Sequence, residues 1–208
     1  MSFGKYLLGT IISPYDTFNR LRDDPKQLVH GSKAILLIGV LYTLTVIGLA
    51  VVKAEITVPA WISIPEDRYY FWEIFFALPV FILGWIMAAG VAHLLSRFFR
   101  GRGTFESTLA VLAFAVTIPS FVSWITETIG TILIIAGVMT HADWVTMTSG
   151  HGFWQAFGLA YQLAALTWCL LLFPLAISRA QSLRPWQASI VGLSTFLVFG
   201  LSMFVFIR

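Results

Sequence analysis

The stretch LGWIMAAGVAHLLSRFFRGRGTFESTLAVLAFAVTIP, residues 83–119, places apolar segments on both sides of a short loop that carries three arginines. The two apolar segments extend over residues 74–96 and 107–139. A helix needs about 20 apolar residues to cross the roughly 30 Å of hydrocarbon in a bilayer, so each segment is long enough. The stretch therefore predicts two membrane-spanning helices joined by a basic loop.

Three further apolar segments of span length lie outside this stretch, at residues 34–52, 153–178 and 187–207. With 58% hydrophobic and 11% charged residues, the chain is too apolar for a soluble domain, in which about 25% of residues are charged. We expect an all-α, polytopic integral membrane helical bundle with five transmembrane helices. This domain should cover residues 34–208 and follow a cytoplasmic segment, residues 1–33.

Basic residues set the expected orientation, because cytoplasmic loops carry the excess of Lys and Arg. Ten of the 13 fall on one side of the predicted spans: Lys5, Arg20, Arg22, Lys26, Lys33, Arg97, Arg100, Arg102, Arg179 and Arg184. The other three are Lys53, Arg68 and Arg208. We expect the N-terminus in the cytoplasm and the C-terminus outside.

The third apolar segment, residues 107–139, is longer than one span requires. As a single helix its 33 residues would measure about 50 Å. Two spans in this length would move Arg179 and Arg184 to the outer side, against the charge rule. We therefore expect one long helix, tilted and bent at Pro119, which removes a backbone hydrogen bond. Its far end should emerge or fold back near the outer surface.

A short amphipathic helix is expected before the first span. Ser13 and Pro14 have the chemistry of a helix start, and Asp24, which precedes a proline, should end the helix. Tyr15, Phe18 and Leu21 share one apolar face. We expect this helix to lie on the cytoplasmic surface of the bilayer. A basic flank that serves only to orient the first span is the alternative.

Two polar residues at membrane depth are candidate sites. A carboxylate in a span is costly and usually faces a bundle interior or a cavity, which makes Glu127 the first candidate. The alternative places it near the outer interface, hydrogen-bonded by Thr126, Thr128 or a neighbouring helix. His93, late in the second segment, is the second candidate. The alternative there is a packing histidine that pairs with a polar group such as Glu106.

No motif of an enzyme is present. The chain lacks the HExxH, GxSxG, P-loop and dinucleotide-binding patterns, so we expect no catalytic residue, no cofactor and no enzymatic activity. His141, Asp143 and His151, with Glu127 or Glu73, are donor types that suit zinc, but the 141–151 spacing matches no compact helical motif, and we assign no metal. The basic residues mark loop ends, as membrane topology requires, and we expect no nucleic-acid partner.

Small residues at four-residue intervals mark one face of the second segment. Gly84, Ala88 and Ala92 would let another backbone approach closely. The partner helix belongs either to the same chain or to a second copy in a homodimer.

Several of these segments together resemble a known family. GWIMAAGVA at residues 84–92, the basic loop with Gly101-x-Gly103-x-Phe105, and an apolar helix that reaches Pro119 are similar to the core of the Yip family. Residues 13–25, with Pro14-x-x-x-Phe18-x-x-Leu21, resemble an element that precedes the first span in prokaryotic members. The likeness covers nearly the whole chain.

The resemblance implies a five-helix membrane bundle in the compact prokaryotic branch, and hence the cytoplasmic (inner) membrane. Eukaryotic relatives bind Rab-type GTPases through a long cytoplasmic N-terminal region. This chain has 33 residues there, so we do not expect a Rab-type GTPase partner.

The expected function is that of a non-enzymatic scaffold, or of a protein that binds a partner or lipid in membrane organisation or trafficking. Its contacts would be membrane lipids, another membrane protein or a second copy. The residues expected on the cytoplasmic contact face are Arg97, Arg100, Arg102, Arg20 and Arg22. The alternative is a small transporter or channel subunit with Glu127 and His93 in a polar path.

Overall fold

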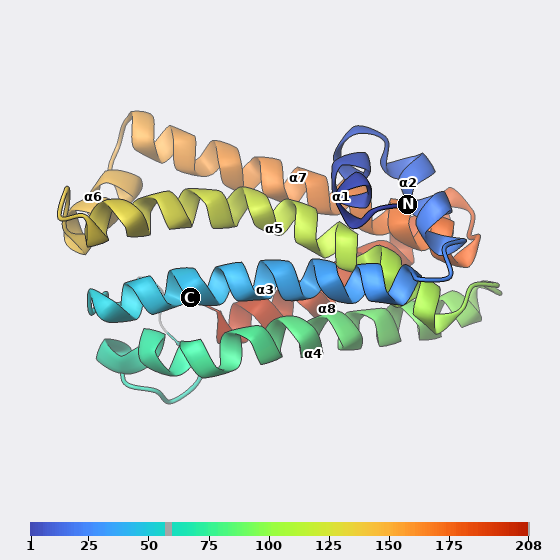
Figure 1. The fold of residues 1–208 in the computed structure, drawn as a ribbon, viewed down its shortest axis with the longest axis horizontal. Coiled ribbons are helices and arrows are strands. Elements are labelled where there is room, and N and C mark those ends of the chain that lie inside the picture. The colour runs from blue at the N-terminus through green and yellow to red at the C-terminus, as the bar shows by residue number, and fades with distance from the viewer. Residues whose placement is uncertain (57–59, 208) are drawn as a thin grey trace.

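The computed structural model describes residues 1–56 and 60–207, and every regular element within these ranges is a helix (Figure 1). Five helices are long and apolar enough to cross a membrane. They are α3 (Gln27–Val51), α4 (Tyr69–Phe98), α5 (Phe105–Ile135), α7 (Phe153–Gln181) and α8 (Pro185–Phe206). The predicted five-span bundle is therefore confirmed.

Four short helices cap the two ends of this bundle. α1 (Phe3–Ile12) and α2 (Pro14–Arg22) lie at one end, beside the loops that join α4 to α5 and α7 to α8 (Figure 1). We call this the basic end, because it holds the ten Lys and Arg residues named above. The short helices η1 (Glu66–Arg68) and α6 (His141–Ser149) lie toward the opposite end, the α6 end.

The first half of α5 forms the centre of the bundle. All 13 residues from Ser107 to Pro119 are buried, as expected for a helix that is apolar on all sides. A Cβ added at Gly31 of α3 would lie 2.8 Å from the Ala110 Cα, so glycine permits this close crossing. On another side, the Trp85 indole N–H donates to the Leu109 carbonyl over 2.9 Å. This half of the bundle is packed solid.

α5 is one helix, as predicted, and its ribbon changes direction along its length (Figure 1). Its 31 residues measure about 46 Å, so it extends beyond the hydrocarbon at the α6 end. The connection that follows contains a short helix, α6, which the sequence analysis did not identify. Thr140 and Asp143 form a capping box at the start of this helix, with each side chain bonded to the other's backbone N–H.

α2 begins at Pro14 and ends at Arg22, close to the predicted bounds. The prediction that its apolar face rests on the bilayer is wrong. Phe18 and Leu21 are fully buried, because α2 packs against the ends of α7 and α5. The sequence pattern shows an apolar face but does not distinguish a lipid surface from the apolar ends of other helices.

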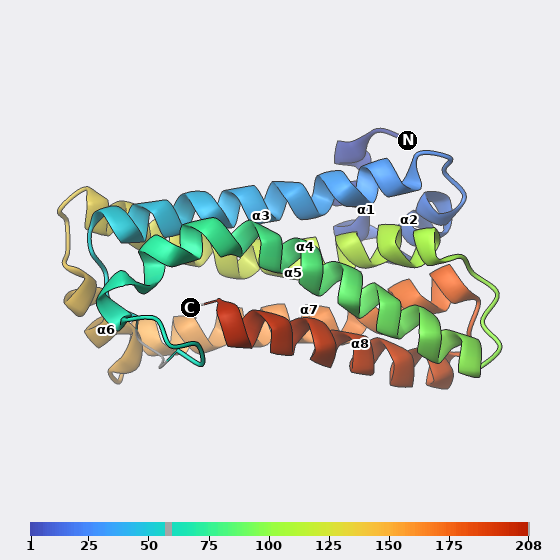
Figure 2. The same ribbon diagram turned by 90° about the horizontal axis from the view of Figure 1, so that it is seen from below.

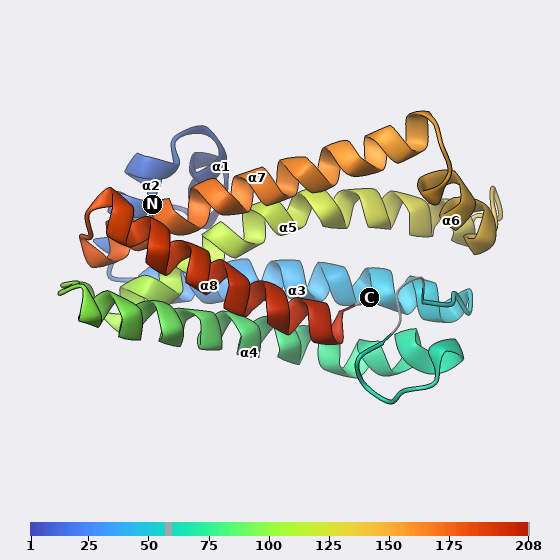
Figure 3. The same cartoon turned by 180° about the vertical axis from the view of Figure 1, so that it is seen from behind.

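α7 and α8 cross closely near the basic end and then diverge toward the α6 end (Figure 3). At the crossing, a Cβ on Gly192 would lie 2.5 Å from the Pro174 nitrogen, and the Phe173 and Phe196 rings lie 5.6 Å apart. The diverging half of α7 exposes many apolar side chains, as a lipid-facing helix does. The divergence opens space beside the second half of α5, which keeps close contacts with Gly48 of α3 and Trp144 of α6.

The small-residue stripe of α4 is buried inside the chain. α4 and α8 lie side by side (Figure 2), and a Cβ on Gly84 would lie 3.1 Å from the Met203 Cε. Ala88 and Ala92 are almost completely buried on the same helix. The stripe therefore packs within the chain and offers no free face for a second copy.

Candidate functional site

Glu127 lies in the second half of α5, where α7 has moved away, and its side chain is exposed. It lines three adjoining cavities, of about 210, 240 and 160 Å³. The first is bounded by α5, α6 and α7 and the second by α3, α4, α5 and α8, while the third lies toward the α6 end. The structure thus places Glu127 at the junction of three cavities.

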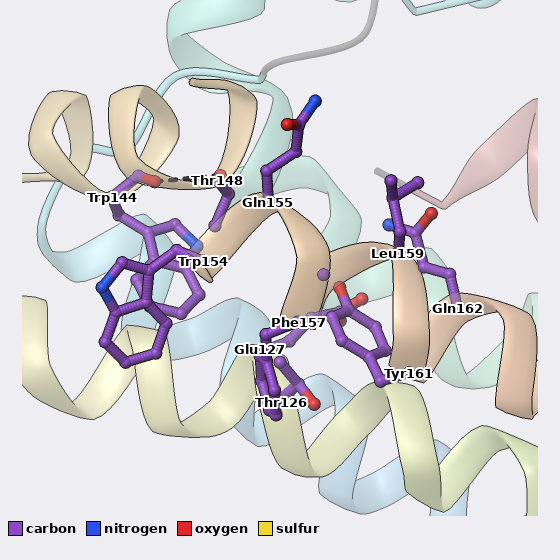
Figure 4. Close-up of a pocket in the computed structure, with 11 residues that line it drawn as sticks. Thr126, Glu127, Trp144, Thr148, Trp154, Gln155, Phe157, Leu159, Tyr161 and Gln162 are labelled. Carbon is purple, nitrogen blue, oxygen red and sulfur yellow. Dashed lines mark hydrogen bonds between the residues drawn. The ribbon is translucent and has the colours of Figure 1, made fainter. Parts of the chain in front are cut away.

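The cavity between α5, α6 and α7 combines aromatic and polar side chains around the carboxylate (Figure 4). We call it the polar cavity. Its lining includes the rings of Trp144, Trp154 and Tyr161 and the polar groups of Thr148, Gln155 and Gln162. The described residues that line it include no Lys or Arg. Glu127 is therefore the charged group of the polar cavity.

The cavity between α3, α4, α5 and α8 is mainly apolar, and we call it the apolar cavity. Its walls include Ile38, Phe81, Phe199 and Met203. Along its α5 wall lie three polar residues: Ser120, Ser123 and Glu127. Their spacing of three and four residues places them on one helix face. The polar face of α5 thus borders an apolar space and ends at Glu127.

The neighbouring threonines do not satisfy the Glu127 carboxylate. The Thr126 hydroxyl donates to the Val122 carbonyl, and the Thr128 hydroxyl lies 2.8 Å from that of Thr45. The alternative in which Thr126 or Thr128 bonds Glu127 is therefore wrong. Within residues 1–56 and 60–207, no hydrogen bond reaches this carboxylate, although carboxylate oxygens are strong acceptors.

A second carboxylate, Glu73 of α4, is completely buried, and the Tyr42 hydroxyl lies 3.3 Å from its Oε1 as a donor. Sequence reasoning considered Glu73 as a possible metal ligand and not as a buried acid of the bundle. The available signal was its place immediately before the second apolar segment, one turn after Tyr69 and Tyr70. The second half of the bundle therefore contains two acidic groups at similar depth.

His93 belongs to a different network, centred on Gln181 at the end of α7. The Gln181 amide nitrogen lies 3.1 Å from His93 Nδ1 and donates to the Thr108 hydroxyl over 2.6 Å. The Gly103 N–H donates to the Gln181 Oε1 over 3.1 Å. The suggested partner of His93, Glu106, is exposed, so that pairing is wrong. This network joins α4, α5 and α7.

The structure does not bring His93 and Glu127 together. Thr108, which belongs to the His93 network, and Glu127 are 19 residues apart on α5, or about 28 Å. The solid core from Ser107 to Pro119 lies between them. A continuous polar path through both residues is therefore absent from the described part of the chain.

Four of the five predicted contact arginines are exposed at the basic end: Arg20, Arg97, Arg100 and Arg102. The fifth, Arg22, is engaged inside the chain, where it bonds Asp23 and the Arg179 carbonyl. Phe98 and Trp186 are also exposed at this end. The Phe99 and Trp186 rings are 5.6 Å apart, so the two loops of the basic end lie together.

Asp24 ties the N-terminal helices to the start of α3. It accepts a 2.6 Å hydrogen bond from the Tyr6 hydroxyl and a 2.8 Å bond from the Lys26 N–H. These bonds, together with the nearby N-terminal ammonium, hold the pKa of Asp24 at about 2, below its usual value. α1 and α2 are thus fixed in place by an ionised carboxylate.

The three residues near the α6 end that were weighed for metal binding do not form a site. Asp143 is used by the capping box, where the bonds with Thr140 lower its pKa. Partial burial lowers the pKa of His141, and His151 is exposed. Across the described ranges, no group of three His, Cys, Asp or Glu residues could hold a metal ion.

Comparison with known proteins gives a family assignment. The family model described as the Yip1 domain matches residues 8–207, which is nearly the whole chain. No curated protein and no solved structure matches the chain.

Proposed function

The chain belongs to the Yip1 domain family, a family of membrane proteins linked to trafficking, and from this premise we propose that it is a non-enzymatic scaffold. Its basic end would bind the anionic headgroups of the cytoplasmic leaflet or an acidic partner protein. We further propose that the basic end faces the cytoplasm of a prokaryotic cell, in agreement with the positive-inside rule.

One observation carries this proposal: exposed arginines and exposed aromatic rings occur together at the basic end. Arg97, Arg100 and Arg102 lie within six residues, beside Phe98 and Trp186. Aromatic rings settle at the membrane interface, where they would hold the arginines at headgroup level. Each basic residue near an anionic surface contributes about 1 kcal/mol, so three would contribute about 3 kcal/mol.

The backbone of this loop is held by the bundle, which favours binding. The Arg102 N–H donates to the Gln181 carbonyl over 3.0 Å, and the Gly101 N–H donates to the Ser96 carbonyl over 2.7 Å. Arg100 is held at a φ of +62°, in the left-handed region. A preorganised loop loses less conformational entropy on binding than a flexible one.

A small transporter or channel subunit is the second candidate, supported by the polar cavity around Glu127. The solid core from Ser107 to Pro119 argues against it, because the cavities lie in one half of the bundle. Reconstituted flux that is lost in Glu127→Gln would favour transport over the scaffold.

The arginine proposal is tested by native mass spectrometry of the purified protein with phosphatidylglycerol. In the triple variant Arg97→Gln, Arg100→Gln and Arg102→Gln, retention of this lipid should fall by at least about tenfold. The control variant, Lys53→Gln with Arg68→Gln, removes basic charge from the α6 end and should retain it as the unaltered protein does. Equal retention by the two variants would refute the proposal.

A further inference from the structure

The polar cavity has the chemistry of a cation site. The Glu127 carboxylate receives no hydrogen bond from the described residues, and it lies beside the rings of Trp144, Trp154 and Tyr161 (Figure 4). Aromatic faces attract cations, and a carboxylate that receives no hydrogen bond from the protein can accept them from a ligand. A primary ammonium supplies both a positive charge and three N–H donors, whereas a quaternary ammonium supplies no donor.

The rest of the lining favours a ligand with no net charge. Thr148, Gln155 and Gln162 are neutral, and the described lining residues include no Lys or Arg to balance an anionic ligand. The amide N–H groups of Gln155 and Gln162 provide neutral donors for a phosphate next to the ammonium. A zwitterion fits this arrangement better than an anion.

The adjoining apolar cavity fits a hydrocarbon chain. It has a volume of about 240 Å³ and shares Glu127 with the polar cavity. Ile38, Phe81, Phe199 and Met203 line it, and they belong to α3, α4 and α8. A soluble amine would leave this space unused, whereas a lipid would fill both cavities at once.

The depth of Glu127 matches a headgroup. α8 has 22 residues and measures about 33 Å, close to the hydrocarbon thickness. The carbonyl of its last residue, Phe206, accepts a hydrogen bond from the Tyr69 hydroxyl. Tyr69 therefore marks, on α4, the depth at which the hydrocarbon region ends. Tyr70 and Glu127 line the same cavity, so Glu127 lies near this boundary.

We propose that the Glu127 cavities bind a phospholipid with a primary ammonium headgroup from the leaflet at the α6 end. The ammonium binds Glu127 among the aromatic rings, and part of an acyl chain occupies the apolar cavity. The lipid enters between the diverging halves of α7 and α8 (Figure 3). This inference goes beyond the scaffold proposal and rests on residues at the opposite end of the bundle.

The test is native mass spectrometry of the full chain, delipidated in detergent and offered three lipids with identical acyl chains. The lipids are phosphatidylethanolamine, phosphatidylcholine and phosphatidylglycerol. The unaltered protein should retain phosphatidylethanolamine at least about tenfold more than phosphatidylcholine. Glu127→Gln, which is nearly isosteric, should lower that retention by about tenfold or more, because it removes the charge that binds the ammonium.

Glu106→Gln is the matched control, since it makes the same change at an exposed position of the same helix. It should leave phosphatidylethanolamine retention unchanged. Tyr161→Leu, which removes one ring, should lower retention by a smaller factor. Size-exclusion chromatography establishes that each variant is folded.

Three results would overturn the inference. One is equal retention of phosphatidylethanolamine and phosphatidylcholine, and another is unchanged retention in Glu127→Gln. The third is binding of soluble glycerophosphoethanolamine as tightly as the lipid, which would identify a site for a soluble amine. The arginine triple variant should keep phosphatidylethanolamine bound, so a failure of the scaffold proposal is distinguishable from a failure here.

Discussion

Replacing Gln181 with Leu should destabilise the bundle measurably. The Gln181 side chain is fully buried and takes part in three hydrogen-bonding contacts, with His93, Thr108 and the Gly103 N–H. Interhelical hydrogen bonds in membrane proteins contribute about 0.6 kcal/mol on average and up to about 1.7 kcal/mol. Loss of all three should therefore lower the free energy of unfolding by about 2 kcal/mol, since leucine nearly preserves the volume.

The free energy of unfolding can be measured by titration with sodium dodecyl sulfate in mixed micelles, followed by tryptophan fluorescence. Gln162→Leu is the control, because Gln162 is exposed on the same helix. Thr108→Val combined with Gln181→Leu gives a double-mutant cycle, whose coupling energy should be about 1 kcal/mol. If Gln181→Leu were within about 0.5 kcal/mol of Gln162→Leu, the network would not hold the helices together as argued.

Three further predictions concern the helix crossing, the N-terminal helices and the orientation. Gly192→Leu should lower the unfolding free energy by about 3 kcal/mol, because its Cβ would meet a backbone 2.5 Å away; the same titration measures this. The Tyr6 hydroxyl bond and the backbone bond lower the pKa of Asp24 to about 2, so its stabilisation of α1 and α2 is present above pH 4 and declines toward pH 2. Protease cleavage of the N-terminal segment should rise over that range with an acid-stable protease. In a background without Cys169, Arg102→Cys should react with an impermeant maleimide after cells are opened, and Thr140→Cys should react in intact cells.

Each of these predictions has a result that contradicts it. Gly200→Ala is the control for the crossing, because a Cβ there meets nothing within 4 Å, and equal stability of the two variants would refute the close contact. Asp24→Asn should remove the pH dependence of cleavage, and an unchanged pH profile would assign it to other groups. Labelling of Arg102→Cys in intact cells would reverse the proposed orientation.

The spans were predictable because length and composition decide them. Five apolar segments had to cross the bilayer. Most ends of the five helices lie within a few residues of the ends of the predicted segments, or extend beyond them. The single third helix followed from charge, since a second crossing would have moved Arg179 and Arg184 to the other side. These are one-dimensional properties of the chain, and no contact between distant residues was needed.

The contacts between distant residues could not be predicted. His93 pairs with Gln181, 88 residues away, and no spacing rule connects them. The apolar face of Phe18 and Leu21 was visible, but the surface that covers it was not. α6 was missed although Thr140-x-x-Asp143 has the pattern of a capping box. Glu127 was identified because a carboxylate is energetically costly at membrane depth. The cavities around it could not be predicted, because they depend on the divergence of α7 and α8.

The packing of Gly84 against α8 has a consequence for biogenesis. α8 leaves the ribosome well after α4, and Met203, which covers Gly84, is synthesised more than 100 residues after it. During this interval Gly84 lacks the α8 side chains that cover it in the folded bundle. A nascent chain that ends before α8 therefore exposes, at Gly84, a site of close helix approach that the folded bundle conceals.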